Sequence, residues 1–127
     1  MLEKQNNLGG DMNRRKFGMI GEKIAQGYLK DDDYEIIDTN FYTKVGEIDI
    51  ICKKNNTIVF VEVKTRTGFE YGTPAMAVDK NKKAHIKQTA KVYIHLNRLY
   101  NYEIEFDVIE VIIMNGKCKV NHLKQVM

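Results

Sequence analysis

The sequence predicts an α/β protein in which helices cover a central β-sheet, because its segments follow the order helix, three strands, helix, two strands. Two turn signals support this order. The pairs Asn55-Asn56 and Asn115-Gly116 each separate two β-rich runs, as two-residue hairpin loops do. The 127 residues suffice for one domain with one core. We expect this domain over residues 13–127, after a flexible segment over residues 1–12.

A first helix is expected between Asn13, as its N-cap, and Lys30. Its three glycines, Gly18, Gly21 and Gly27, each weaken the helix by roughly 1 kcal/mol relative to alanine. We interpret them as positions of close packing against the sheet. Apolar residues at spacings of three and four form one stripe, which consists of Phe17, Ile20, Ile24 and Tyr28 and is widened by Ala25 and Leu29.

A second helix is expected over residues 79–98, with an inward stripe of Ile86, Ala90, Tyr93 and Leu96 or Asn97. The loop over residues 67–76 contains the only proline of the chain and follows a charged strand, so we interpret it as a segment that faces substrate. Its aromatic residues Phe69 and Tyr71 either stack on bases or pack locally. The strands are expected over residues 34–40, 47–54, 57–65, 103–114 and 117–123.

The hairpin around Asn55-Asn56 brings charged residues together. With this two-residue loop, Asp49 faces Glu62, and Glu47 faces Lys64. Side chains alternate along a strand, so these four residues share one face of the hairpin. The opposite face is wholly apolar and is expected to be core; its residues are Ile48, Ile50, Cys52, Val59, Val61 and Val63.

The predicted pairing of Asp49 with Glu62 points to metal chemistry. Carboxylates on directly opposed residues repel each other unless something offsets their charge, and a divalent cation such as Mg²⁺ (or Mn²⁺) does so. Lys64 lies on the same face, about 7 Å further along the strand. Two carboxylates, a cation and a lysine are the parts of a site for metal-assisted phosphodiester hydrolysis. The alternative is a solvated strand end that carries a surface ion network of little energetic value.

Two motifs carry a family resemblance: Gly46-Glu47-Ile48-Asp49, and Val59-Phe60-Val61-Glu62-Val63-Lys64-Thr65-Arg66. They resemble the signature of the PD-(D/E)xK nuclease superfamily, and more narrowly the YraN-like family of small bacterial proteins, which are similar to archaeal Holliday junction resolvases. Further matching segments lie in the first helix and near the end of the chain, and they are Gly21-Glu22-Lys23-Ile24-Ala25, Tyr34, Asn40-Phe41 and Phe106-Asp107-Val108.

The resemblance implies a restriction-endonuclease-like three-layer fold, with a central mixed sheet and helices on both faces. It implies that Asp49 and Glu62 are metal ligands, that Lys64 is the catalytic lysine, and that Glu22 is the helix glutamate that completes such a site. Helical geometry places Glu22 at the border of the apolar stripe, within reach of the sheet edge. An ordinary solvated glutamate is the alternative for Glu22. Ile48 replaces the proline of the superfamily name, as it does in many members.

Basic side chains predict a nucleic-acid partner, most simply DNA. Lys80, Lys83, Lys87 and Lys91 form one stripe on the second helix, opposite its apolar stripe. Arg66, next to the nuclease-like motif, is expected to add a phosphate contact. Such contacts position a nucleic acid without reading its sequence. A lysine stripe that is only a solvated helix face is the alternative.

Composition sets further limits. The net charge of +3 is mild, and the sequence contains no apolar run long enough to cross a membrane. Cys52 and Cys118 are too few for a disulfide framework, and we expect both as buried free thiols. These features predict a cytoplasmic protein. Two functions stay open: a metal-dependent DNA nuclease, and a non-catalytic nucleic-acid-binding or scaffold module with the same fold. A nuclease that cuts junctions would pair two active sites, as a homodimer does.

Overall fold

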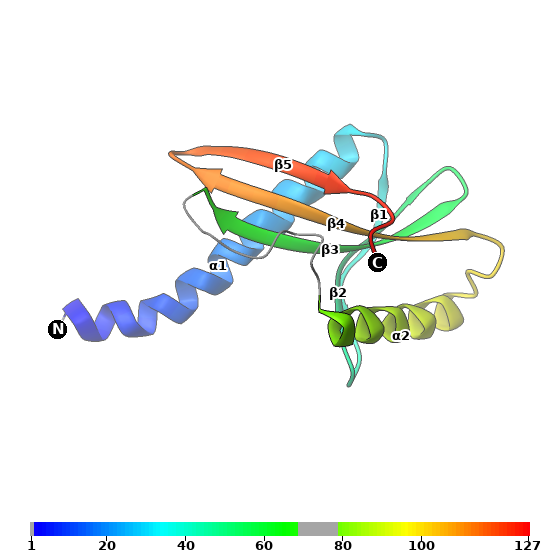
Figure 1. Cartoon of the computed structure of the whole chain (residues 1–127), viewed down its shortest axis with the longest axis horizontal. Coiled ribbons are helices and arrows are strands. Elements are labelled where there is room, and N and C mark those ends of the chain that lie inside the picture. Colours follow the sequence, from blue (N-terminus) through cyan, green and yellow to red (C-terminus); the bar gives the residue numbers. More distant parts are fainter. Residues whose placement is uncertain (1, 69–78) are drawn as a thin grey trace.

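The computed structural model describes the backbone of residues 2–68 and 79–127 and the side chains of residues 13–68 and 79–127. The predicted element order is confirmed (Figure 1). The predicted loop, with Phe69 and Tyr71, lies mostly outside the described residues. The elements are α1 (Leu2–Asp31), β1 (Glu35–Tyr42), β2 (Glu47–Lys54), β3 (Thr57–Thr67), α2 (Lys80–Asn97), β4 (Glu103–Met114) and β5 (Lys117–Leu123).

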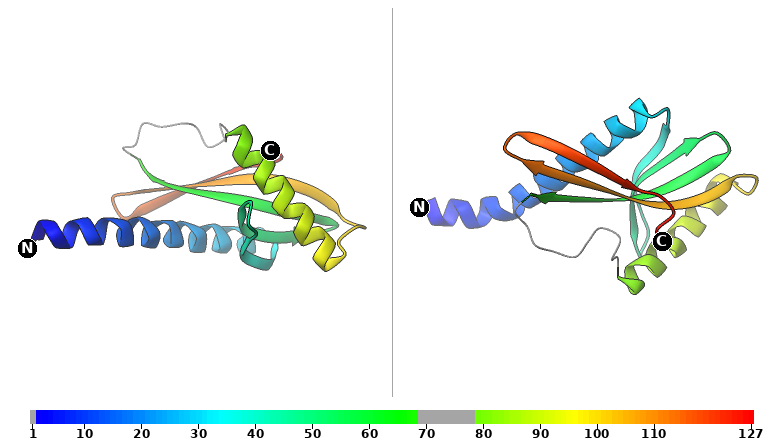
Figure 2. Two further views of the ribbon diagram at one scale, coloured as in Figure 1. Left: turned by 90° about the horizontal axis from the view of Figure 1, so that it is seen from below. Right: turned by 45° about the horizontal axis from the view of Figure 1, so that its top comes forward.

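The five strands form one mixed sheet in the spatial order β1-β2-β3-β4-β5. Only the β3–β4 pair is parallel, and α2 lies in the crossover that joins these two strands. The helices lie on opposite faces of the sheet (Figure 2). The predicted three-layer arrangement is therefore confirmed. No helix in the described parts of the chain combines the length and the apolar character that a membrane crossing requires.

Both predicted hairpins are confirmed. Lys54 pairs with Thr57 across Asn55-Asn56, and Met114 pairs with Lys117 across Asn115-Gly116. Positive φ angles of 55° at Asn55, 53° at Asn115 and 73° at Gly116 explain why asparagine and glycine occupy these loops. The bounds of β2, β4 and β5 agree with the prediction, whereas β1 is shifted along the chain and β3 is two residues longer.

Helix α1 differs from the prediction at its start and in its buried stripe. It begins at Leu2 rather than after Asn13, and residues 2–12 contain no proline that would interrupt its backbone hydrogen bonds. The flexibility of that segment stays a prediction. The buried stripe centres on Ala25 and Leu29, which are fully buried, while the exposed fraction of Ile20 is 50%.

The cause of this rotation is a close approach between α1 and β3 at Gly21. A Cβ atom on Gly21 would lie 1.8 Å from Oγ1 of Thr65, so only glycine fits there. The helix surface with the smallest residues therefore turns toward the sheet. A Cβ atom on Gly18 or Gly27 would meet nothing within 4 Å, so the packing role predicted for these two glycines is wrong.

Helix α2 begins after the N-cap Asp79, whose carboxylate accepts hydrogen bonds from the backbone N–H groups of Asn81 and Lys82. Its predicted inward residues Ile86, Ala90 and Tyr93 are buried. Leu96, offered as the end of that stripe, has an exposed fraction of 65%, because the helix ends one residue later, before the left-handed Arg98.

The core has a part on each face of the sheet. Under α1, Ala25 and Leu29 pack on Ile50, Cys52 and Val61. Under α2, the core consists of Ile48, Ile51, Ile58, Phe60, Ile86, Ala90 and Tyr93. Cys52 is a buried free thiol as predicted, but Cys118 is exposed, because it lies on β5 at the edge of the sheet.

Candidate active site

The site forms where β2 and β3 separate. Their paired residues run from Lys54–Thr57 to Ile50–Val61, in the predicted register. Beyond that point the carboxylate Oδ2 of Asp49 accepts a hydrogen bond of 2.8 Å from the backbone N–H of Val63. The Val63 N–H therefore donates to a side chain instead of to the main chain of β2. The predicted direct pairing of Asp49 with Glu62 is wrong, because the paired residues end at Ile50–Val61.

The same separation changes the two faces of β2. Ile48 was predicted to share a core face with Ile50 and Cys52, but it packs under α2 with Ile51 and Phe60. Ile50 and Cys52 pack under α1. The regular alternation of faces therefore fails next to Asp49, because the strand leaves the β3 ladder there while it stays paired with β1 through Phe41–Ile48 and Tyr42–Glu47.

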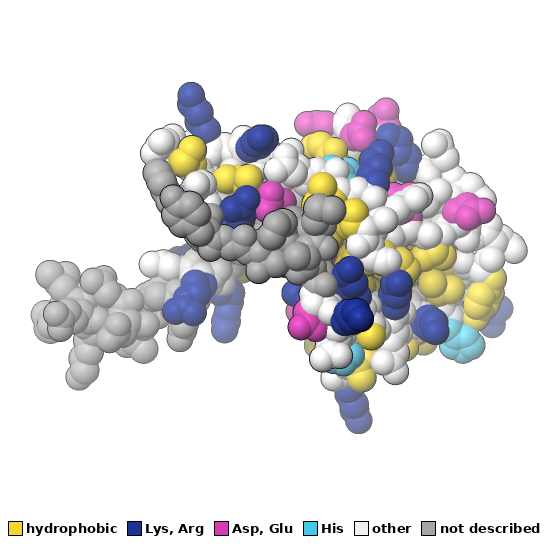
Figure 3. Space-filling model, viewed as in Figure 1, with side chains coloured by type: hydrophobic (Ala, Val, Ile, Leu, Met, Phe, Trp, Pro, Cys, Tyr) yellow, Lys and Arg dark blue, Asp and Glu magenta, His cyan; other side chains and the backbone are white. Residues whose placement is uncertain are grey.

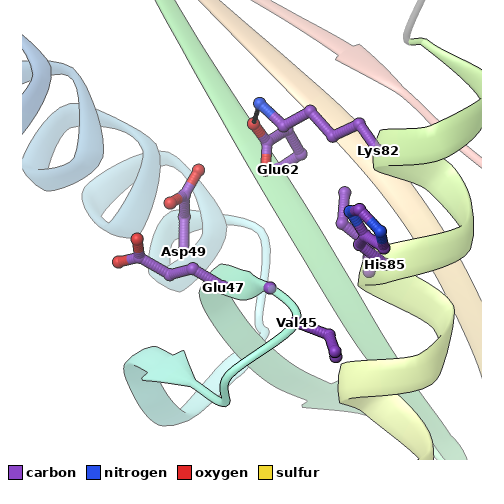
Figure 4. A pocket seen from close by; sticks show the side chains of 8 residues that line it. Val45, Glu47, Asp49, Glu62, Lys82 and His85 are labelled. Atoms are coloured by element: carbon purple, nitrogen blue, oxygen red, sulfur yellow. Dashed lines mark ion pairs between the residues drawn. The ribbon is translucent and has the colours of Figure 1, made fainter.

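A cavity of about 200 Å³ lies between this end of the hairpin and the first turns of α2 (Figure 4). Gly46 allows the loop before β2 to approach the helix, since a Cβ atom there would lie 2.8 Å from Oγ1 of Thr89. In Figure 4 the Glu62 carboxylate faces α2, whereas Glu47 and Asp49 point toward α1. The cavity is lined by Val45, Gly46, Glu47, Asp49, Glu62, Lys82, His85 and Ile86.

Asp49 lies in an environment that disfavours its charge. Burial, followed by the charge of Glu62, raises the pKa of Asp49 to about 8, although the hydrogen bond from Val63 opposes the shift. The charges of Glu22 and Glu47 act in the same direction as Glu62. A carboxylate that holds its proton up to about pH 8 marks a place where a cation would be strongly favoured.

Glu22 reaches this cluster from α1, as its border position in the sequence predicted. Its carboxylate accepts a hydrogen bond of 3.2 Å from Nδ2 of Asn40 on β1. Burial and the charges of Glu47 and Glu62 raise the pKa of Glu22, while hydrogen bonds with Asn40 and Asp49 lower it to a smaller extent. Four carboxylates from one helix and two strands therefore act on one another electrostatically.

Lys82 is the site residue that the sequence interpretation missed. Its Nζ atom lies 2.6 Å from Oε1 of Glu62, a buried carboxylate. Burial lowers the pKa of Lys82, but the hydrogen bond and charge of Glu62 outweigh it, so the pKa is raised. The charges of Asp49 and Glu47 add to this effect. One signal in the sequence could have identified it, because Lys82 lies four residues before the buried Ile86 and therefore on the inward side of α2.

Lys64 lies on β3 two residues after Glu62, half-buried, and is not among the residues that line the cavity. In the parallel register it is opposite Glu110 on β4. Burial raises the pKa of Glu110, but hydrogen bonds from Asn121 and Arg66, with the charges of Arg66 and Lys64, lower it overall. Arg66, predicted as a phosphate contact, donates to Glu110 at 2.8 Å from Nε.

Two basic surfaces flank the carboxylates. The lysine stripe predicted on α2 lies largely exposed, and Figure 3 shows Lys and Arg side chains gathered over this helix. The stripe consists of Lys80, Lys83, Lys87 and Lys91. On the other side, Arg14, Arg15 and Lys23 of α1 line an open cavity of about 460 Å³ that also includes Glu22. The carboxylates therefore lie between two positively charged helix surfaces.

The residues present suit a hard divalent cation. Mg²⁺ typically takes one or two protein carboxylates and fills its other positions with water and phosphate oxygens, which matches Asp49 and Glu62. Among the described residues, no three His, Cys, Asp or Glu side chains form a ready metal-binding group. The fit is therefore to a two-carboxylate site that relies on water and substrate.

Asp107 does not line this cavity and has different surroundings. It is fully buried and accepts hydrogen bonds from Nε2 of His122, at 2.7 Å, and from the backbone N–H of Gln125, at 3.0 Å. The other ring nitrogen of His122 lies 3.0 Å from the Tyr28 hydroxyl. This network connects β4, the C-terminal residues and α1, so we interpret it as structural.

Comparison with known proteins places this arrangement in a family. The family model described as "Uncharacterised protein family UPF0102" matches residues 21–111, which include Glu22, Asp49, Glu62, Lys64 and Lys82. The chain belongs to the UPF0102 family. This result confirms the family resemblance that the sequence motifs indicated.

Several UPF0102 proteins are similar over almost their whole length. One from Alkaliphilus oremlandii is 46% identical over 112 residues, which cover 87% of this chain and 96% of the relative. One from Syntrophomonas wolfei is 40% identical over 109 residues, with coverage of 86% and 95%. One from Caldanaerobacter subterraneus is 45% identical over 115 residues, with coverage of 88% and 94%. The similarity thus extends over the fold and the carboxylate cluster together.

Proposed function

We propose that this UPF0102 protein is a divalent-metal-dependent nuclease that hydrolyses phosphodiester bonds in DNA. The observation that carries the proposal is the carboxylate cluster at the open end of the β2–β3 hairpin. There Asp49 and Glu62 line one cavity, and the pKa of Asp49 is raised to about 8 by burial and by the neighbouring carboxylates. Carboxylates that line one cavity, with the pKa of one of them strongly raised, are a feature of catalytic and metal sites.

In this proposal Asp49 and Glu62 hold Mg²⁺ or Mn²⁺. The bound ion supplies a Lewis acid and lowers the pKa of its water, which provides a nucleophile at neutral pH. The Asp49 carboxylate is kept in place by the N–H of Val63, and Glu62 is held on β3 between buried strands. Glu22 would add to the negative charge of the site from α1.

Lys64 would act from the β3 side. Its Nζ donates a hydrogen bond to the attacking water or to a phosphate oxygen, and so stabilises the charge that develops there. Glu110, which is opposite Lys64, forms a 2.8 Å ion pair with Arg66, so that this carboxylate is already held by another cation. We expect Arg66 to contribute through this ion pair, by fixing Glu110, and to a smaller extent through contact with DNA.

The substrate class follows from charge. The exposed lysines of α2 and the basic side chains of Arg14, Arg15 and Lys23 on α1 lie on both sides of the carboxylates. A phosphate backbone that crosses the site would contact both surfaces, and such contacts are independent of base sequence. A branched DNA, such as a recombination or repair intermediate, fits two basic tracks, and a homodimer would present two sites to it.

The test is cleavage of labelled duplex, single-stranded and four-way-junction DNA with Mg²⁺ or Mn²⁺. We expect metal-dependent cleavage that Asp49→Ala and Glu62→Ala abolish while DNA binding persists. A preference for the junction would identify branched DNA as the substrate. Equal cleavage by the wild type and both variants would show that a contaminant or another site is responsible, and would contradict the proposal.

A second candidate function is a non-catalytic nucleic-acid-binding module. The ion pair between Lys82 and Glu62 favours it, because one carboxylate of the cluster is neutralised without a metal. In that case charge reversal of Lys83, Lys87 and Lys91 abolishes the activity of the protein, and Asp49→Ala behaves as wild type. The two proposals therefore make opposite predictions for Asp49→Ala.

A further inference from the structure

The ion pair between Lys82 and Glu62 connects the proposed metal site to the start of α2. The Nζ–Oε1 distance is 2.6 Å, and the Glu62 side chain is 8% exposed while that of Lys82 is 51% exposed (Figure 4). Lys82 is also the only lysine or arginine among the described residues that line the cavity. Within that part of the chain, a single ammonium therefore faces the carboxylates where a cation would bind.

The positive charge of Lys82 interacts with several carboxylates of the cluster, not with Glu62 alone. Besides Glu62, the charges of Asp49 and Glu47 favour the protonated ammonium. The positive charge that this cavity requires thus comes from the chain itself. An ammonium and a divalent cation cannot both contact the same oxygen of Glu62 closely, because their charges repel and their positions overlap.

The backbone and the side chain of Lys82 are held very differently. Its N–H group donates to the carboxylate of the N-cap Asp79, at 3.4 Å, in the first turn of α2. The long side chain, in contrast, is half-exposed and ends in one ion pair. The ammonium can therefore leave Glu62 and turn toward solvent by rotamer changes alone, without movement of the helix.

We infer that Lys82 is a built-in counter-ion that occupies the cation position of the carboxylate site until a divalent metal displaces it. This inference rests on the proposed function, since it requires that Asp49 and Glu62 bind such a metal. The displaced ammonium stays at the rim of the cavity, on the first turn of the lysine-bearing helix α2.

The inference predicts that removal of the ammonium strengthens metal binding. A half-exposed ion pair of this kind corresponds to about a two- to tenfold change in an equilibrium constant. We therefore expect Lys82→Met to bind Mn²⁺ about two- to tenfold more tightly than the wild type. Lys82→Arg keeps the charge and should bind Mn²⁺ no more tightly than the wild type, because a guanidinium also pairs well with a carboxylate.

The experiment is a Mn²⁺ titration of the folded, DNA-free protein, in which free Mn²⁺ is measured by electron paramagnetic resonance. Lys80→Met is the matched control, since Lys80 lies exposed in the same turn and does not line the cavity. Asp49→Asn and Glu62→Gln report whether the ion binds at the carboxylates. Circular dichroism establishes that each variant is folded before its affinity is compared.

Each result has a distinct meaning. Tighter Mn²⁺ binding in Lys82→Met alone, with Lys80→Met and Lys82→Arg near wild type, supports the inference. Equal or weaker binding in a folded Lys82→Met overturns it while the proposed metal site stands. Absence of Mn²⁺ binding in the wild type, or binding that Asp49→Asn and Glu62→Gln leave unchanged, contradicts the proposed function and the inference together.

Discussion

Asp107 and Glu110 on β4 are as well buried as Glu62 on β3, yet they have very different neighbours. Asp107 accepts hydrogen bonds from His122 and Gln125, and Glu110 accepts them from Arg66 and Asn121. The donors of Glu110 more than offset the effect of burial, so its pKa is lowered. These two carboxylates are embedded among donors, which is what a structural role requires.

The carboxylates at the end of the hairpin have mainly other carboxylates as their charged neighbours. Burial raises the pKa of Asp49 to about 8, and Glu62, Glu22 and Glu47 all contribute to the shift. The difference between the two groups shows that burial alone does not identify a functional carboxylate. A functional carboxylate is identified by an excess of nearby negative charge with few hydrogen-bond donors, because such an arrangement costs stability.

The largest difference between the two groups should appear in cleavage. Glu62→Gln removes the charge of a proposed metal ligand, and we expect the rate of metal-dependent DNA cleavage to fall by on the order of 100-fold or more. Asp107→Asn is the control and should cleave at a rate near that of the wild type at 25 °C. Rates of Mg²⁺-dependent cleavage of labelled DNA measure both. A comparable loss in the two variants would remove the distinction.

The free energy of unfolding should depend on Asp107, whereas the cleavage rate should not. Asp107→Ala leaves His122 and the N–H of Gln125 without their acceptor in a buried place, and we expect a loss of about 2–4 kcal/mol in the free energy of unfolding. Urea denaturation followed by circular dichroism measures this loss. A loss below about 0.5 kcal/mol would show that the network around Asp107 contributes little to the fold.

Asp49→Asn should stabilise the metal-free protein, by on the order of 1 kcal/mol at pH 8. The folded protein holds the Asp49 proton up to about pH 8, whereas the unfolded chain releases it near its ordinary pKa of 3.8. The contribution of Asp49 to the free energy of unfolding of the wild type therefore decreases as the pH rises from about 4 to about 8. Asparagine does not titrate and can still accept from Val63.

The gain from Asp49→Asn should consequently vanish near pH 4 and grow as the pH rises. Thermal denaturation of both proteins in EDTA at pH 4, 6 and 8 measures this trend. A variant that is less stable than the wild type at pH 8 would mean that the Asp49 carboxylate is satisfied in the folded protein, and that the contrast with Asp107 is not one of charge.

The smallest effect should come from the basic surface of α1. Charge reversal in Arg15→Glu and Lys23→Glu together should weaken DNA binding by about three- to tenfold and reduce its salt dependence, because two phosphate contacts are lost. Fluorescence anisotropy at several salt concentrations measures both quantities. Lys117→Glu with Lys119→Glu on the edge strand β5 is a control of equal charge. Equal weakening by both pairs would indicate a nonspecific effect of net charge.

Much of the fold was predictable because it depends on local signals. Asn55-Asn56 and Asn115-Gly116 fix the two hairpins, and these turns in turn fix the register of the strands beside them. Helix α2 was expected from residue 79 and begins one residue later, after the N-cap Asp79. The buried stripe of α1 was not predictable in the same way, since the choice between two overlapping stripes depends on the contact of Gly21 with β3.

The members of the carboxylate cluster were predictable, but their geometry was not. Asp49, Glu62 and Glu22 followed from motif position, and the structure brings them together. The hydrogen bond from Val63 to Asp49 was not predictable, because a pairing rule assumes that the strands stay paired. Lys82 was missed although it lies four residues before Ile86, on the inward side of α2, because it was grouped with the neighbouring lysines of the basic stripe.

The most direct test of the carboxylate site is a crystal structure of the protein grown or soaked with Mn²⁺, with anomalous diffraction data. We expect an anomalous peak within coordination distance of the Asp49 and Glu62 carboxylates, with the Lys82 ammonium turned away from Glu62. A structure without a peak at these carboxylates, in which Lys82 still contacts Glu62 under saturating Mn²⁺, would contradict it.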